Sequence, residues 1–349
     1  MKAMVIRALC DLEKNKKPLV PLDIPIPEPD EGEILIKVAA CGVCHTELDE
    51  IEGRTPPPRL PMIPGHQVVG RVEKSGGGTT GFKVGDRVGV AWIYSACGSC
   101  GFCLEGRENL CPRFMGTGRD AHGGYAEYMK VPEAFAVAVP DEFSDVEAAP
   151  LLCAGAVGYR SLRLTGMKDG ENIGLTGFGA SGHLVLEMVK HLYPGSGIYV
   201  FARSEGERNF AREQGAVWAG DTADVPPERP DCIIDTTPAW KPVVEALRNL
   251  KRGGRLVINA IGKEDGDKGY LQRISYQDHL WMEKSLKTVA NVTRKDVSEF
   301  LSIAADIPVR PVISTYPLAS ANEALVELKE RKIRGAKVLV MDGSQAEGP

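Results

Sequence analysis

Two short segments near the N-terminus carry residue types that can bind a metal ion and pass a proton. The first is Cys41-Gly42-Val43-Cys44-His45-Thr46-Glu47, and the second is Gly65-His66-Gln67. A thiolate and an imidazole with a hydroxyl close by are the parts of an open zinc site, where three protein ligands leave a fourth position for a substrate. The third ligand must come from elsewhere in the chain. Taken singly, Cys-x-x-Cys is also typical of a redox pair or of two buried thiols.

A second set of thiols follows in a glycine-rich stretch. Cys97, Cys100, Cys103 and Cys111 form a Cys-x2-Cys-x2-Cys-x7-Cys cluster. Four thiolates at this spacing can surround zinc tetrahedrally with no place left for water, which indicates a structural site. An iron-sulfur cluster uses the same ligand set and is the competing interpretation.

A glycine-rich turn later in the chain has the context of a dinucleotide-binding unit. The apolar run from Ile173 to Phe178 predicts a buried strand, apolar residues at helical spacing follow from Leu184, and Ile198 to Ala202 predicts the next strand. Glycines between a strand and a helix let the backbone approach a pyrophosphate at the helix N-terminus. The residues that we expect to bind the cofactor here are Gly177, Gly179, Ala180, Ser181 and Gly182.

The end of the second strand indicates which dinucleotide binds. An acidic residue usually stands here to bind the ribose 2′-hydroxyl, but this chain has Ala202, Arg203 and Ser204. A guanidinium pairs with a phosphate, and no carboxylate is present to repel it. We therefore expect NADP, with NAD as the alternative, and we interpret Arg208 as a solvated helix charge.

Composition limits the class of protein. With 349 residues the chain is long enough for two domains, and its 43% hydrophobic and 26% charged residues are typical of a globular protein. A net charge of -5 with interspersed signs, and the lack of a run of 18 apolar residues, lead us to expect neither a nucleic-acid nor a membrane partner. Nine cysteines, several in tight spacing, favour metal over disulfides and a cytoplasmic location.

The pattern of elements changes near residue 150. Short strands and prolines predict a mainly β region before it, and alternating strands and helices after it predict a parallel doubly wound sheet. We interpret Cys10, Cys41 and Cys232 as buried or half-buried thiols. The expected strands are 2–9, 33–40, 68–73, 87–92, 123–128, 231–236, 255–261 and 337–341, the last rejoining the first region; the expected helices begin at 151 and span 241–250, 294–304 and 320–331; and 343–349 should be a frayed tail.

Together these motifs resemble the zinc-dependent alcohol dehydrogenases of the medium-chain dehydrogenase/reductase superfamily. The resemblance covers nearly the whole chain and depends on five matches in the family's order. They are Gly-Val-Cys-His-Thr at 42–46, Gly-His at 65–66, the four-cysteine loop, Leu-Leu-Cys-Ala-Gly at 151–155 and the glycine-rich turn.

The resemblance implies an α/β fold in which a GroES-like, mainly β catalytic domain (1–153 and 291–349) is interrupted by a Rossmann domain that binds NADP (154–290). It implies that Cys44, His66 and Cys153 bind a catalytic zinc, a choice of Cys44 over Cys41 that spacing alone does not make. Thr46 would take the proton of the alcohol, and His45 would lie near the pyrophosphate. Trp92 would be a wall of the substrate pocket, and Ile51 and Ile93 also suggest an apolar pocket.

The implied activity is hydride transfer between NADP(H) and an alcohol and its aldehyde or ketone, in a homodimer or homotetramer with two zinc ions per chain. Two alternatives remain open: a reductase of activated double bonds in which the zinc is dispensable, and a nucleotide-binding protein without turnover.

Four positions depart from the family pattern. Gln67 replaces the glutamate of Gly-His-Glu, and Glu47 stands where an aspartate usually orients the ligand histidine. Asp49 occupies the place of a histidine that ends the proton relay in some members. The C-terminal arginine that often contacts the cofactor has no clear match, and Arg334 and Lys337 are the nearby candidates.

Overall fold

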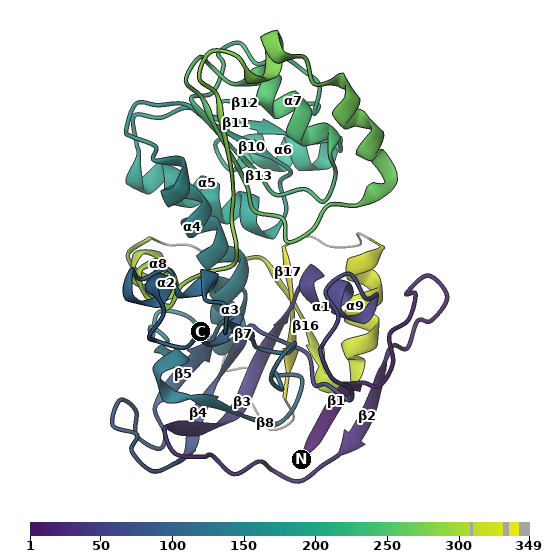
Figure 1. Ribbon diagram of the computed structural model, residues 1–349, viewed down its shortest axis with the longest axis vertical. Helices are drawn as coiled ribbons and strands as arrows, with labels where there is room; N and C mark the ends of the chain where they lie inside the picture. Colours follow the sequence, from purple (N-terminus) through teal and green to yellow (C-terminus); the bar gives the residue numbers. More distant parts are fainter. Residues whose placement is uncertain (308–309, 331–334, 342–349) are drawn as a thin grey trace. The chain divides into compact units, whose positions relative to one another are not determined.

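The computed structural model describes residues 1–307, 310–330 and 335–341, which fall into two compact units (Figure 1). Unit 1 comprises residues 1–156, 292–306 and the described residues from 310 onward. Unit 2 comprises residues 157–291 together with Ile307. Both ends of the chain therefore build one compact body, and a continuous central segment builds the other.

Unit 1 is organised around one long strand, β3 (Glu33–Val43). It pairs antiparallel with β4, β8 and β17, so segments from the beginning, middle and end of the chain share one sheet. The pairing of β17 with β3 confirms that the last strand rejoins the first region. The other strands of this sheet are β4 (Val68–Ser75), β5 (Arg87–Val90), β8 (Tyr128–Pro132), β9 (Ala136–Ala138), β16 (Ile313–Pro317) and β17 (Ala336–Val340).

Two small sheets complete the β structure of unit 1. The strands β1 (Lys2–Ile6) and β2 (Leu19–Asp23) pair antiparallel and form a sheet of two strands. Because no further strand pairs with β2 in this sheet, Pro21, which lacks a backbone N–H, breaks no hydrogen bonds on its outer side. The second sheet joins β6 (Ile93–Ser95) to β7 (Met115–Gly116).

The predicted strand at 123–128 is wrong except for its last residue, because β8 begins only at Tyr128. The backbone N–H groups of Gly123, Gly124 and Tyr125 instead donate to the carbonyls of Ile63, Gly65 and Pro64. These bonds tie the segment to the loop that carries His66.

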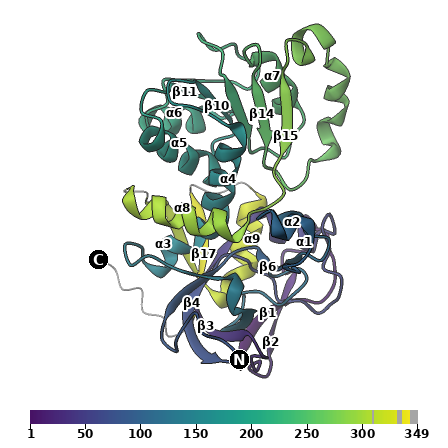
Figure 2. The same ribbon diagram turned by 60° about the vertical axis from the view of Figure 1, so that its left-hand side comes forward.

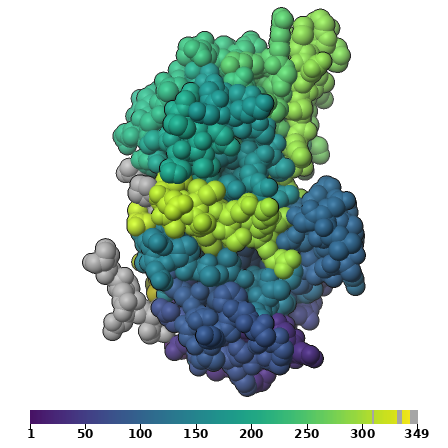
Figure 3. Space-filling model, turned by 90° about the vertical axis from the view of Figure 1, so that its left-hand side faces the viewer, coloured from purple at the N-terminus to yellow at the C-terminus, as the bar shows by residue number. Residues whose placement is uncertain are grey.

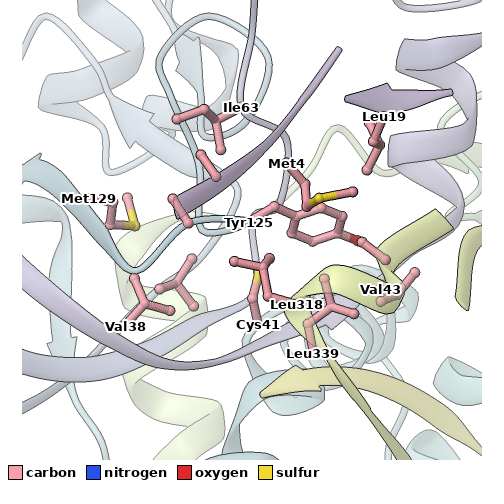
Figure 4. Packing of buried hydrophobic residues seen from close by; sticks show 14 of the residues in the cluster. Met4, Leu19, Val38, Cys41, Val43, Ile63, Tyr125, Met129, Leu318 and Leu339 are labelled. Carbon is pink, nitrogen blue, oxygen red and sulfur yellow. The ribbon is translucent and has the colours of Figure 1, made fainter. Parts of the chain in front are cut away.

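The core of unit 1 lies between its sheets and its helices. Tyr125 is fully buried there, and Figure 4 shows it surrounded by Met4, Cys41 and Leu318. The prediction of a buried thiol is confirmed for Cys41, which is 0% exposed. The helices of unit 1 are α1 (His45–Ile51), α2 (Gly101–Leu104), α3 (Asp145–Pro150), α8 (Arg294–Asp306) and α9 (Ala321–Lys329).

Unit 2 contains a six-stranded sheet with the order β12-β11-β10-β13-β14-β15, in which every neighbouring pair is parallel. From β10 the chain adds strands first on one side of the sheet, to β12, and then on the other, from β13 to β15. With right-handed crossovers, this change of direction places helices on both faces of the sheet. The predicted doubly wound sheet is confirmed, and Figure 2 shows β15 at its edge. The strands are β10 (Ile173–Thr176), β11 (Ile198–Phe201), β12 (Trp218–Gly220), β13 (Cys232–Asp235), β14 (Arg255–Ile258) and β15 (Ser285–Thr288). The helices are α4 (Ala156–Thr165), α5 (Ala180–Leu192), α6 (Glu205–Glu213) and α7 (Lys241–Asn249). The first residue of α4 is the last residue of the N-terminal segment of unit 1.

Within the described residues, no helix has the length and apolar character needed to cross a membrane. The expected frayed tail and Arg334 lie outside the described residues.

Candidate active site

The first part of the site is built by the start of α1. Cys44 is in extended conformation immediately before the helix, and the side chain of Glu47 returns to accept a 2.7 Å hydrogen bond from the Cys44 backbone N–H. This arrangement satisfies a free donor at the helix N-terminus. It also sets the Cys44 thiol beside the Thr46 hydroxyl, with 3.6 Å between Sγ and Oγ1.

The second part is His66, which is 1% exposed. Gly65 precedes it with φ +100, and a Cβ at this position would lie 2.3 Å from the Tyr125 ring, so only glycine fits the turn. His66 Nδ1 lies 2.6 Å from Glu47 Oε1. The contact orients the ring and leaves Nε2 as the atom that faces the thiols.

Cys153 completes the group from a distant part of the chain. It lies in a single π-helical turn, Leu151–Gly155, between α3 and α4. Gly155 allows this turn to pack against α8, because a Cβ there would lie 2.2 Å from the Phe300 ring. Cys153 Sγ lies 3.9 Å from Cys44 Sγ and 3.3 Å from His66 Nε2.

The three ligand atoms all lie within 4.8 Å of one another. Thiolates bound to one tetrahedral zinc at about 2.3 Å would lie about 3.8 Å apart, which is close to the observed separation of the two sulfurs. We call Cys44, His66 and Cys153 the triad. Its donor set of two sulfurs and one nitrogen fits zinc, and three protein ligands leave one position open.

The charges of the triad are strongly interdependent. A hydrogen bond from Cys153 lowers the pKa of Cys44 well below its usual value, and the same contact raises the pKa of Cys153. Burial alone would lower the pKa of His66, but the Glu47 carboxylate and Cys44 outweigh burial and raise it well above its usual value. Burial raises the pKa of Glu47 against the opposing effect of His66.

Gln67 and Asp49, which depart from the family pattern, are both at least partly buried, whereas the nearby His45 is exposed. Gln67 is 4% exposed and lies so close to Gly42 that a Cβ there would be 2.5 Å from the amide oxygen. Asp49 Oδ1 accepts a 2.5 Å hydrogen bond from Arg54 Nε. Burial raises the pKa of the Asp49 carboxyl group. His45 is exposed as the first residue of α1.

Trp92 and Ile51, two of the residues expected at a substrate pocket, have different surroundings. Trp92 is half-buried and packs edge-on against His66, with ring centroids 6.3 Å apart, and against Phe114 at 5.7 Å. It therefore lies beside the triad. Ile51 is 0% exposed and belongs to the hydrophobic core of unit 1, so it offers no surface to a substrate.

The four-cysteine segment forms a second group of possible ligands. The sulfurs of Cys97, Cys100, Cys103 and Cys111 all lie within 4.8 Å of one another. Most residues from 98 to 107 around them are exposed, and the segment projects from the surface of unit 1 (Figure 3). Backbone N–H donors, with help from Arg113, lower the pKa of Cys97 to about 5, whereas burial and Cys100 raise that of Cys103 to about 12. Four cysteine sulfurs, without a carboxylate or an imidazole among them, are the number of ligands that closes a tetrahedral structural zinc site.

The glycine-rich turn of unit 2 has the shape expected of a nucleotide cradle. Gly177 has φ +78, and a Cβ there would meet Thr236 and Thr237 at 2.9 Å. A Cβ on Gly182 would lie 2.9 Å from the Gly177 carbonyl oxygen. Next to Gly179, at the start of α5, a Cβ would meet nothing within 4 Å. The turn therefore leaves open space at the helix N-terminus, followed along the helix by Ala180 and Ser181.

The three residues after β11 that we expect to bind the cofactor differ in solvent exposure. Ala202 is 2% exposed, whereas Arg203 and Ser204 are exposed. Ser204 caps α6 by accepting a bond from the Glu207 N–H. Arg208 is not a solvated charge as expected, because its guanidinium donates 2.8 Å bonds to the carbonyls of Ala202 and Arg203.

Sequence reasoning missed a buried ion pair at the carboxyl edge of this sheet. The Lys263 ammonium contacts the Asp235 carboxylate and donates to the carbonyls of Thr237 and Ala239. Asp235 is 0% exposed and also accepts a 2.6 Å bond from Thr176. The pair joins the end of β10 to the loops that follow β13 and β14. Only the occurrence of Asp235 at the end of an apolar strand gave a signal for it.

Lys337, a candidate for cofactor contact, is only 4% exposed, and its ammonium is bound to Tyr316 and Glu327 within unit 1.

Comparisons with known proteins agree with this fold and site. Residues 30–141 match the family described as the alcohol dehydrogenase GroES-like domain. The chain is 42% identical to a probable alcohol dehydrogenase AdhA of Mycobacterium tuberculosis, over 93% of each chain. Among solved structures, an NAD-dependent alcohol dehydrogenase aligns with a TM-score of 0.86 at 25% identity, over 97% of this chain and 99% of that one. CAD from Helicobacter pylori, complexed with NADP(H), aligns with a TM-score of 0.84 at 25% identity, over 98% of both chains.

The chain therefore belongs to the zinc-type alcohol dehydrogenase family of the medium-chain dehydrogenase/reductase superfamily. It is an oxidoreductase with a GroES-like domain and a Rossmann sheet. The expectation from the sequence motifs is confirmed at this level.

Proposed function

We propose that the protein is a zinc-dependent oxidoreductase that transfers a hydride between NADP(H) and an alcohol with its aldehyde or ketone. The observation that carries this proposal is the triad, in which two thiols and an imidazole from three segments converge within 4.8 Å. Zinc bound there supplies a Lewis acid that polarises the substrate oxygen, and the nicotinamide carries the hydride. In this proposal the catalytic domain consists of 1–153 with 291–349, and the domain that binds NADP consists of 154–290.

The residues around the triad have distinct roles in this proposal. Cys44, His66 and Cys153 hold the metal, and Glu47 keeps the His66 ring in the orientation that presents Nε2. Thr46, whose hydroxyl lies 3.6 Å from the Cys44 sulfur, takes the proton of the alcohol. The four cysteines from Cys97 to Cys111 hold a second, structural zinc.

The cofactor site belongs to unit 2. The open space beside Gly179 suits a pyrophosphate, and the N-terminus of α5 offers it N–H groups and a positive dipole end. Arg203 is exposed, and within the described part of the chain its guanidinium has no bonded partner, so it is available to a 2′-phosphate. We therefore favour NADP over NAD. His45 is exposed at the start of α1, and its proposed position near the pyrophosphate follows from the family pattern alone.

We also propose a homodimer or homotetramer that acts in the cytoplasm on a small alcohol or carbonyl compound. The edge strand β15 is exposed along its whole length, and Trp281 and Leu286 are about half exposed, at 50% and 49%. An open edge strand with exposed apolar side chains on it and shortly before it is suited to pairing with a second copy. All nine cysteines are free, which fits a reducing compartment.

The test is the loss of NADPH absorbance against a panel of aliphatic, aromatic and cyclic carbonyls, with NADH in parallel, before and after chelation. We expect turnover with NADPH that is lost when the metal is removed. Turnover that survives chelation would favour the double-bond reductase, and tight NADPH binding without turnover would favour the silent nucleotide-binding protein.

Two cysteine variants sharpen this test. Cys44→Ser removes a triad sulfur and should abolish turnover. Cys10→Ser changes a half-buried thiol outside both cysteine groups and should leave turnover unchanged. Equal activity of both variants would exclude the triad as the catalytic site.

A further inference from the structure

A carboxylate without a partner lies on α1, the helix that begins directly after Cys44. Glu50 is 0% exposed, and neither of its carboxylate oxygens has a hydrogen-bond partner among the described residues. A buried ionised group without a partner is costly, so such a group in a native protein requires an explanation such as a nearby ion or water.

The position of Glu50 on α1 places it on the side of the triad. It follows Glu47 by three residues and Thr46 by four, and side chains at these spacings share one face of a helix. Glu47 on this face contacts both His66 and the backbone of Cys44. All three of Thr46, Glu47 and Glu50 are buried, so this face of the helix points into unit 1.

The charges that act on Glu50 are mostly those of the site itself. They come from Glu47, His66, Cys44 and the guanidinium of Arg119. Arg119 is shared with Asp120, to which it donates at 3.1 Å, and its side chain is 33% exposed. Tyr125, whose hydroxyl is also buried without a hydrogen-bond partner among the described residues, experiences the charges of both Glu47 and Glu50.

These groups have more negative than positive charge available. Two carboxylates and two thiols accompany one imidazole and the guanidinium of Arg119, which is already paired with Asp120. Gln67 next to His66 adds no charge. A divalent cation held by the triad would supply the missing positive charge. Glu50 would then interact with it through a buried region where little water weakens the attraction.

We propose that Glu50 strengthens the binding of a divalent metal ion at the triad from outside the ligand set, as a positioning residue whose charge acts on the ion. The inference rests on the zinc site of the proposed function. It assigns a purpose to a buried carboxylate that would otherwise only destabilise the fold.

The test compares wild-type protein with Glu50→Gln, which keeps the shape of the side chain and removes its charge. Zinc affinity is measured by competition with a chelator, and the ion at the triad is identified as the one that Cys44→Ser protein lacks. We expect the affinity at the triad to fall about 10- to 100-fold. We also expect the Tm of the metal-free variant to rise at neutral pH, because burial raises the pKa of Glu50 and the carboxyl group therefore disfavours folding above its usual pKa, a cost that the neutral amide lacks.

The control is Glu13→Gln, at an exposed position outside both cysteine groups, which should change neither quantity. An unchanged zinc affinity in Glu50→Gln, or a fall in both affinity and metal-free Tm, would overturn the inference, the latter by showing a merely structural role. Wild-type protein that binds only one zinc per chain, with none at the triad, would overturn the proposed function as well. The number of ions in the wild-type protein therefore separates the two failures.

Discussion

The carboxylate of Glu47 holds two parts of the triad at once. Its Oε1 lies 2.6 Å from His66 Nδ1, and its Oε2 accepts a 2.7 Å hydrogen bond from the Cys44 backbone N–H. Glu47 is 0% and His66 1% exposed, so water and salt weaken this contact little. One side chain thus couples the orientation of the imidazole to the start of the helix that follows the Cys44 thiol.

Replacing Glu47 by glutamine should weaken zinc binding at the triad about 10- to 100-fold, because the amide can still bond to His66 but supplies no charge. Chelator competition measures the affinity, and kcat/KM should fall with it. Glu13→Gln, at an exposed position, is the matched control. Unchanged affinity would show that zinc binding at the triad does not depend on the charge of this carboxylate.

Arg203→Ala should weaken NADPH binding about 10- to 100-fold and leave NADH binding nearly unchanged, because a charge-assisted bond to the 2′-phosphate contributes about 1.5 to 3 kcal/mol. Fluorescence titration with each cofactor measures both Kd values. Arg252→Ala removes another exposed guanidinium of unit 2 and should affect neither. A parallel loss for both cofactors would refute the assignment of Arg203 to the phosphate.

Lys263→Met should destabilise the protein by about 3 to 5 kcal/mol, because it leaves the fully buried Asp235 carboxylate without its cation. Denaturant unfolding measures this loss, and NADPH affinity should fall as the end of β10 and the loops after β13 and β14 lose their common contact. Lys268→Met is the control, since that side chain is 63% exposed. A change below about 1 kcal/mol would mean that other contacts hold these loops.

Cys103→Ser should reduce the zinc content from two ions to one per chain and lower the Tm, because the three thiolates that remain do not complete the four-ligand structural site. Elemental analysis counts the ions. The triad should retain its zinc, and Cys10→Ser should retain both. Iron and sulfide in the purified wild-type protein would instead support a cluster at these four cysteines.

The pH dependence of Lys337 can be worked out from its surroundings. Burial lowers its pKa, but the bonds to Glu327 and Tyr316 outweigh burial and raise it above 10.5. Its contribution to stability is therefore fully present below pH 10.5 and is lost as the pH rises through the higher value of the folded state. Lys337→Met should lower the free energy of unfolding by about 1 to 3 kcal/mol at pH 8, with the difference disappearing at strongly alkaline pH.

The same variant should bind NADPH as the wild type does, because the ammonium of Lys337 is already engaged within unit 1. Lys14→Met, at an 86% exposed side chain, is the control for stability. Weaker NADPH binding in Lys337→Met would restore it as a cofactor contact.

Much of the fold followed from local patterns in the sequence. The alternation of strands and helices, the glycine-rich turn before α5 and the four clustered cysteines were all predicted, because each depends on residues close together in the chain. The strand expected at 123–128 failed for the opposite reason. Its backbone bonds go to a loop some 60 residues earlier, and no local pattern indicates such a partner.

The triad shows what tertiary structure decides. The sequence offers Cys41 and Cys44 as equivalent candidates, but β3 directs Cys41 into the core, where it is 0% exposed, while the start of α1 turns Cys44 toward His66 and Cys153. The ion pair of Asp235 with Lys263 and the isolation of Glu50 are likewise visible only after folding. Spacing along the chain determines which ligand types are available, whereas their convergence and burial result from packing between segments distant in sequence.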